Sequence, residues 1–234
     1  MGKVNSGLYT AYSGMQAQLD ALEILANNLA NVNTPAFKEQ NSFFAFLNKS
    51  IQAIDETGGL EKAVNQSIVT RGTTNMMGGS LTATNRDLDV AIEGNGFLVV
   101  QAANGIRYTR NGNLHLNNKY ILTTSDGFPV MGAANNRPIT LGPGMVQINS
   151  DGQVSLDGEQ VDRLKVVSFE DLSLLEKEGN SLFISREGQS SEKSSDAKIK
   201  PGYLEQSNVN PVSSVVKMVE VLRHFEAIQK SIAK

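Results

Sequence analysis

The sequence predicts an α+β protein, in which discontinuous N- and C-terminal helices of the coiled-coil type accompany an antiparallel, all-β central domain. Near each end of the chain, apolar residues recur at alternating spacings of three and four, which is the helical period. Between these ends, Asn-Gly or Asp-Gly pairs lie at residues 95–96, 104–105, 111–112, 126–127, 151–152 and 157–158. Such pairs are typical of tight turns between antiparallel strands.

The first helix is predicted from a row of apolar or small residues with a period of 3.5, the period of a coiled-coil seam. This row consists of Leu8, Tyr12, Met15, Leu19, Leu22, Ala26 and Leu29. Only Asp20 and Glu23 are ionised between Val4 and Phe37, so we expect equivalent helices of other subunits to cover much of this helix. The same residues could instead form the core of an ordinary monomer.

Four asparagines mark the predicted end of this helix. The helix is expected to stop near Pro35, because proline disfavours the helical conformation in the residue before it. Asparagine tolerates the left-handed turn that ends helices. Helix termination accounts for at most two of the four, so we expect the others to hydrogen-bond across subunits; the four are Asn27, Asn28, Asn31 and Asn33.

The middle of the chain divides into a connector and a β domain. Residues 37–79 hold an aromatic cluster and glycine pairs without a clear period, and this predicts an extended connector with at most one short helix. The expected terminal helical module consists of residues 1–36 together with 208–234. The expected connector is 37–79, and the expected β-rich domain is 80–207.

The closing helix is predicted from Val212 to Lys234, with Pro211 at its first turn. Its predicted seam consists of Val215, Met218, Leu222, Phe225 and Ile232. More apolar residues widen the stripe beyond what one partner would cover, namely Val212, Val216, Val219, Val221 and Ile228. Because two isolated helices are marginally stable, we expect both ends of a single molecule to be loose and to become ordered when many copies pack together.

Composition excludes several functional classes. The net charge is -3 and basic residues do not cluster among aromatics, so nucleic acid is not an expected partner. The absence of cysteine excludes thiolate catalysis and disulfides. No long apolar run or cleavable signal pattern occurs, so we expect neither a membrane span nor a cleaved signal peptide.

Candidate catalytic and metal sites are also weak in this sequence. His115 and His224 do not belong to a metal-binding spacing. The segment EGNGFL lacks the third glycine of a dinucleotide fingerprint, and NSDGQVSLDGEQVD lacks the glycine and glutamate of a calcium loop. We therefore expect no enzyme activity, no cofactor, no metal and no small-molecule substrate.

Three blocks of the sequence resemble one protein family. They are SGLYTAYSGMQAQLDALEILANNLANVNTPAFK, the pair LDVAIEGNGFLVVQ and RYTRNGNLHL, and GYLEQSNVNPVSSVVKMVEVLRHFEAIQKSI. In this order they resemble the first helix, the first β-hairpins and the closing helix of the flagellar axial family, the rod and hook subunits of the bacterial flagellum. The resemblance implies a structural subunit whose terminal helices polymerise and transmit motor torque.

The resemblance also implies partners and a location. The partners would be the chain itself, other rod and hook proteins, and the flagellar type III export apparatus. The location would be the periplasmic rod of the basal body, reached without a cleaved signal. The length favours a rod protein over a hook protein. DRLKVVSF and RHFE are more similar to the proximal rod type, which is the favoured interpretation. LANNLANVNTPAFK is more similar to the distal type, which is the close alternative.

An alternative from another class is a periplasmic protein with a helical dimerisation stalk. Its β domain would act on peptidoglycan or bind carbohydrate. Asp87 and Asp89 flank Leu88 and are expected to share one strand face, as an acid/base pair could. Solvent-facing carboxylates have the same spacing in many sheets, so the structural protein is the favoured interpretation.

Overall fold

The protein divides into two compact units, which are described separately. The computed structural model describes residues 2–54, 60–179, 181–185, 193–195 and 197–232. Side chains are described for residues 11–42, 72–179, 181–185, 193–195 and 197–230. Unit 1 contains Met1–Ala30, Glu39–Asn75 and Val209–Lys234, and unit 2 contains Asn31–Lys38 and Met76–Asn208.

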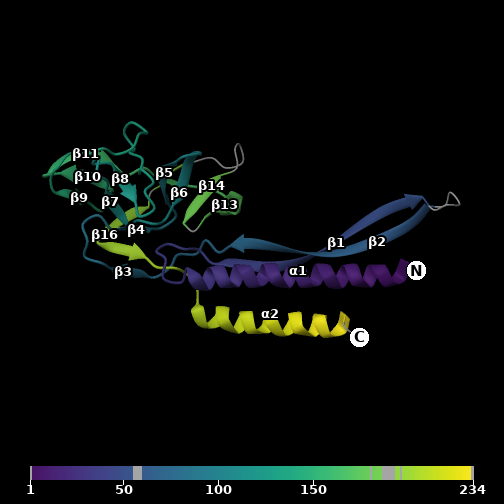
Figure 1. Cartoon of the computed structure of the whole chain (residues 1–234). Coiled ribbons are helices and arrows are strands. Elements are labelled where there is room, and N and C mark those ends of the chain that lie inside the picture. Colours follow the sequence, from purple (N-terminus) through teal and green to yellow (C-terminus); the bar gives the residue numbers. More distant parts are fainter. Residues whose placement is uncertain (1, 55–59, 180, 186–192, 196, 233–234) are drawn as a thin grey trace. The chain divides into compact units, whose positions relative to one another are not determined.

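Unit 1 combines two helices with one long β-hairpin (Figure 1). The helices are α1 (Gly2–Ala30) and α2 (Pro211–Ile232), and the strands are β1 (Gln40–Ile54) and β2 (Leu60–Thr74). The strands pair antiparallel in an unbroken register from Gln40 opposite Thr74 to Ile54 opposite Leu60. Helix α1 contacts both α2 and the hairpin.

The buried face of α1 is built largely from small residues. Side chains along this face recur at spacings of three and four, at Gly14, Ala17, Ala21, Leu25 and Asn28. Glycine and alanine carry no atoms beyond Cβ, so neighbouring elements can approach the helix closely. This face differs from the seam predicted for α1, and the predicted seam is therefore not the core of unit 1.

Helix α2 begins where the sequence predicts. Pro211 is its first residue, and the Asn210 side chain accepts hydrogen bonds from the amides of Val212 (3.0 Å) and Ser213 (3.1 Å). These bonds satisfy two amides that have no partner inside the helix. No helix in the described part of the chain is long and apolar enough to cross a membrane.

Unit 2 is built from short strands whose pairs are all antiparallel, as predicted. The first strands are β3 (Leu81–Ala83), β4 (Val90–Glu93), β5 (Phe97–Ala102), β6 (Gly105–Thr109), β7 (Leu114–Leu116), β8 (Leu122–Thr124), β9 (Val146–Ile148) and β10 (Gln153–Leu156). Then follow β11 (Glu159–Arg163), β12 (Val166–Ser168), the 3-10 helix η1 (Leu172–Leu174), β13 (Leu175–Glu178), β14 (Leu182–Ser185), β15 (Lys193–Ser194), β16 (Lys198–Pro201) and β17 (Tyr203–Glu205).

These strands form one larger sheet and several small ones. The six-stranded sheet has the order β13-β14-β6-β5-β12-β15, and a three-stranded sheet has the order β11-β10-β9. Two-stranded sheets pair β16 with β4, β17 with β3, and β7 with β8. The last strand, β17, thus pairs with β3 at the start of the unit, so the β domain closes on itself.

Strand β5 separates two apolar cores. Alternate residues of a strand point to opposite faces; Leu98 and Val100 belong to one cluster, and Phe97 and Val99 belong to the other. The second cluster is aromatic, with the Phe97 ring centroid 5.7 Å from that of Phe183 in edge-to-face geometry. Burial on both faces explains the continuous apolar run at the start of this strand.

The observed division of the chain differs from the expected domain ranges in two places. Most of residues 37–79 forms the β1–β2 hairpin, where a connector with at most one short helix was expected. The aromatic and β-branched residues there favour strands. Residues 31–38, expected to belong mostly to the helical module, lie in unit 2, where Phe37 and Lys38 are fully buried.

The six predicted turns have different outcomes. Those at 104–105, 151–152 and 157–158 each connect two paired strands, as expected. The turn at 126–127 follows β8, and the one at 95–96 joins β4 to β5, which lie in different sheets. The sixth pair, Asn111 with Gly112, makes no hairpin: Asn111 is buried, and the Gly112 carbonyl accepts a hydrogen bond from the Val90 amide.

A candidate assembly surface

The exposed apolar side chains concentrate on the two helices. Eleven large hydrophobic residues are exposed among the described side chains, and four of them lie in unit 2, at Met77, Tyr120, Met145 and Val161. The other seven lie on α1 and α2 and are 44% to 73% exposed: Tyr12, Leu19, Val212, Val215, Val216, Val219 and Leu222. Contiguous apolar surface of this kind marks sites of protein association.

On α1 the predicted seam divides into two rows. Tyr12, Leu19 and Ala26 are exposed, and they follow one another at intervals of seven residues. The other row is half-buried and consists of Met15, Leu22 and Leu29. The side chain of Leu8 lies outside the described residues. The seam therefore borders the packed face of unit 1, and one of its rows is exposed.

On α2 the apolar residues occupy two faces. One face is at least partly buried and consists of Ser214, Met218, Val221, Phe225 and Ile228. The other is exposed and consists of Val212, Val215, Val216, Val219 and Leu222. The predicted seam mixes the two, since Val215 and Leu222 are exposed while Met218 and Phe225 are half-buried; the side chain of Ile232 is not described. The wide apolar stripe predicted for this helix therefore divides into two faces, one at least partly buried and one exposed.

Asn28 makes contacts within the chain that the sequence did not predict. Its fully buried side chain donates a hydrogen bond from Nδ2 to the Gln40 carbonyl (2.7 Å) and accepts one at Oδ1 from the Gln40 amide (3.0 Å). The amide side chain thus pairs with the main chain as a neighbouring strand would, and it fixes the start of β1 to the end of α1. This asparagine bonds within the chain rather than across subunits.

Replacing Asn28 with leucine is expected to lower the free energy of unfolding of unit 1 by about 1 to 3 kcal/mol, because both main-chain groups of Gln40 lose their side-chain partner. Hydrogen exchange should accelerate at the Gln40 amide. Asn33→Leu is the matched control, because Asn33 is exposed, and it should change neither quantity. Equal effects of both substitutions would contradict the assignment.

A cleft in unit 2 has a volume of about 250 Å³ and is lined by several charged residues. The Arg163 Nε donates to the Asp151 carbonyl (2.7 Å), and the Lys165 Nζ donates to the Asn136 Oδ1 (2.9 Å). Lys193 pairs with Glu170. These charges are engaged in structural contacts and do not form an acid/base pair.

The other candidate catalytic residues do not come together either. His115 lies in β7 of unit 2 and His224 in α2 of unit 1, as the sequence predicted for each element. Asp87 is exposed while Asp89 is buried, so they do not share a strand face as expected; the chain turns at Asp87. Within the described residues, no three His, Cys, Asp or Glu side chains group as metal ligands would.

Sequence reasoning missed a set of buried charges in unit 2. Lys38, Arg110 and Glu205 are almost fully buried and contact one another through the Glu205 carboxylate. Nearby, the Lys177 ammonium lies 3.4 Å from the centre of the Phe37 ring and donates to the Lys38 carbonyl (3.0 Å). Burial lowers the pKa of Lys177 to about 8. No local pattern connects these residues, because their partners are distant in sequence.

Family models match the chain in three places. Residues 8–38 match the flagella basal body rod protein model, residues 91–156 match the flagellar hook protein FlgE/F/G D1 domain, and residues 200–234 match the C-terminal model of the flagellar basal body rod FlgEFG protein. The first and last matches include most of the described exposed residues of α1 and α2.

Several proteins are similar over nearly the full length. The flagellar basal-body rod protein FlgF of Caulobacter vibrioides is 34% identical over 97% of this chain and 92% of its own length. FlgF of Salmonella typhimurium is 34% identical over 98% and 93%, and FlgG of Bacillus subtilis is 30% identical over 96% and 93%. The chain therefore belongs to the family of flagellar basal-body rod proteins.

Proposed function

We propose that this protein is a structural subunit of the bacterial flagellar basal-body rod, and that it assembles through the exposed apolar faces of α1 and α2. The observation that supports this most directly is the exposed stripe of α2, in which five apolar side chains recur along one face. Burying such a side chain contributes about 1.5 to 3 kcal/mol, so a stripe of this length favours association with another helix.

The two helices use different faces for different purposes in this proposal. The half-buried face of α2, with Val221 and Phe225, packs within unit 1 as a pair of coiled-coil type with α1, and the exposed face remains for other subunits. The predicted α1 residues Tyr12, Leu19 and Ala26 would meet such a face. Contacts between unlike surfaces do not close on themselves and therefore generate a helical assembly.

The partners and the location follow from the same proposal. The chain would pack against copies of itself and against other rod and hook proteins, and it would reach the periplasmic rod through the flagellar type III apparatus without a cleaved signal. FlgF relatives are 28% to 34% identical to this chain and FlgG relatives 30% to 31%. The choice between the two types therefore rests on the segments DRLKVVSF and RHFE, and the proximal rod position is the one we favour. The ends of a single molecule would gain order in the rod.

The substitution Val219→Glu tests the proposal. It places a carboxylate in the exposed stripe of α2, where assembly would bury it without a partner. We expect the amount of this variant in isolated basal bodies to fall at least about tenfold, because a loss of about 1.4 kcal/mol in the free energy of association already corresponds to a tenfold change. Thermal unfolding of the free protein should not change, because Val219 is 44% exposed.

Gln229→Glu is the matched control, because it adds the same charge at an exposed position of the same helix. It should enter basal bodies like the unmodified protein and restore swimming to a deletion strain. Normal incorporation of Val219→Glu would remove this face from the assembly surface. A deletion strain that swims normally would remove the rod function itself.

A further inference from the structure

The chain passes between the two units four times, after Ala30, Lys38, Asn75 and Asn208. Three segments of unit 2 carry these passages: the short segment Asn31–Lys38, the segment that begins at Met76, and the segment that ends at Asn208. Each segment lies far from the others in sequence. Their arrangement inside unit 2 therefore decides the points at which the chain enters and leaves it.

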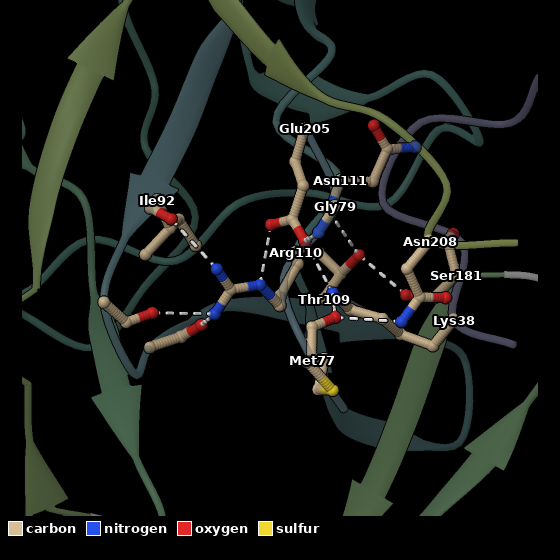
Figure 2. Close-up of polar contacts among 12 residues, drawn as sticks. Lys38, Met77, Gly79, Ile92, Thr109, Arg110, Asn111, Ser181, Glu205 and Asn208 are labelled. Carbon is tan, nitrogen blue, oxygen red and sulfur yellow. Dashed lines mark hydrogen bonds and ion pairs between the residues drawn. The ribbon is translucent and has the colours of Figure 1, made fainter. Parts of the chain in front are cut away.

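Glu205 belongs to the segment that ends at Asn208, and its carboxylate contacts the other two segments (Figure 2). Its Oε1 accepts hydrogen bonds from the Lys38 Nζ (2.5 Å) and from the Gly79 amide (2.9 Å). Its Oε2 accepts from the Arg110 Nε (2.8 Å). Lys38 belongs to the first segment, Gly79 to the second and Glu205 itself to the third, while Arg110 comes from the body of the β unit.

Hydrogen bonds to main-chain carbonyls connect the same three segments. The Ala36 amide donates to the Glu205 carbonyl (2.8 Å), and the Asn208 amide donates to the Phe37 carbonyl (3.3 Å). The Met77 carbonyl accepts from the Lys38 Nζ (2.7 Å) and from the Asn208 Nδ2 (2.9 Å). We call this set of contacts the clasp; it consists of Ala36, Phe37, Lys38, Met77, Gly79, Arg110, Glu205 and Asn208.

Arg110 attaches the clasp to the β unit. Besides Glu205, its guanidinium donates to the carbonyls of Gly96 (2.8 Å) and Gly94 (3.0 Å), in the turn between β4 and β5, and to that of Ile92 (2.9 Å) in β4. Arginine suits this position because its planar group presents several donors in a fixed geometry. The clasp is thereby held to β4 and to the turn that leads into β5.

The charge balance makes Glu205 the central member. Lys38 is fully shielded from solvent, Arg110 is 7% exposed, and Glu205 is the only carboxylate with which either forms an ion pair in the described residues. Burial alone would raise the pKa of Glu205, but the charges of Arg110 and Lys38 and the bonds from Lys38 and Gly79 lower it below its ordinary value. The carboxyl group is therefore ionised at neutral pH.

We propose that Glu205 is a positioning residue, which holds the entering and leaving segments of unit 2 at one fixed place. The chain then enters and leaves unit 2 through segments that are hydrogen-bonded to one another rather than through independently moving ones. For a rod subunit the clasp would carry the load between the helices and the β unit, and that consequence alone rests on the function proposed above. Buried ion pairs often add little net stability, so a positioning role accounts for this network better than a stabilising one.

The test is amide hydrogen exchange on the full chain carrying Glu205→Gln. The glutamine keeps the size of the side chain but leaves Lys38 and Arg110 without a counter-charge. We expect the Ala36, Gly79 and Asn208 amides to exchange at least about tenfold faster than in the unmodified protein. The Leu122 and Val130 amides, which donate within the β unit, should keep their protection. This contrast separates a local positioning role from a general loss of stability.

Glu178→Gln is the matched control, because Glu178 also pairs with an arginine in unit 2 and its side chain is 44% exposed. It should leave the three clasp amides unchanged. Lys38→Met gives a milder test should Glu205→Gln fail to fold, because it keeps the Arg110 pair and removes the bonds to Met77 and Glu205. It should accelerate exchange at Ala36 and Asn208.

Two results would overturn the proposal. One is unchanged exchange at the clasp amides in both variants, and the other is an equal acceleration at the clasp and at Leu122 and Val130. Because exchange is measured on the isolated chain, neither result depends on rod assembly. Failure of the rod function would appear instead as normal swimming of a deletion strain.

Discussion

Phe183→Ala is expected to lower the free energy of unfolding of unit 2 by about 3 to 5 kcal/mol, measured by denaturant titration. Phe183 is fully buried in β14 and packs edge-to-face on Phe97, which in turn contacts Phe169 at a centroid distance of 5.9 Å. Removing one ring takes away its transfer free energy and leaves a cavity. The neighbouring rings cannot close this cavity, because a second core lies on the other face of β5.

The control for this prediction is Val161→Ala in β11, an edge strand. Val161 is 46% exposed, and its truncation should change the free energy of unfolding by less than about 0.5 kcal/mol. The two results together would show that the buried aromatic cluster, and not the exposed apolar surface, stabilises the unit. A loss at Phe183 no larger than the loss at Val161 would contradict the assignment of this core.

Gly112→Ala is the second substitution with a large expected effect. A Cβ at this position would lie 1.8 Å from the carbonyl oxygen of Val90, a distance that no pair of unbonded atoms can adopt. Val90 is fully buried in β4, and its amide donates to the Gly112 carbonyl (2.9 Å). We expect a loss of about 3 kcal/mol or more, because strand β4 must move to admit the methyl group.

Gly142→Ala is the matched control for this clash. A Cβ at Gly142 would lie 3.4 Å from the Leu156 Cδ2, which is an ordinary contact, so unfolding should be unaffected. Denaturant titration of both variants measures the difference. An alanine tolerated equally at both positions would show that β4 and the Gly112 segment approach each other less closely than the structure indicates.

Gly112 also shows why local patterns misled the sequence analysis. The Asn-Gly pair predicts a hairpin because glycine permits turn conformations. At this position the glycine is required for another reason, since it leaves room for the carbonyl of a strand more than twenty residues earlier in the chain. A single-sequence pattern cannot distinguish these two requirements, because the second depends on a contact made only in the folded unit.

The prediction of a connector, where the structure has the β1–β2 hairpin, was wrong for a related reason. The residues of β1 and β2 have the composition of strands, but the register that pairs them runs between one strand and the other. The alternation of a half-buried strand depends on a surface to pack against. For this hairpin the helix α1 provides that surface, and its small-residue face was hidden in the sequence by the more conspicuous apolar seam.

The sequence by itself determined the two helices, their apolar stripes, the antiparallel β domain and the family. Each of these depends on local periodicity, turn residues or contiguous motifs. Only the tertiary structure decided which stripe is packed and which is exposed, how Asn28 holds β1, and that Lys38, Arg110 and Glu205 meet. Lys38 and Glu205 are separated by 167 positions. A local pattern carries no information about a pairing across that distance, because burial and the shared carboxylate exist only once the strands between them have packed.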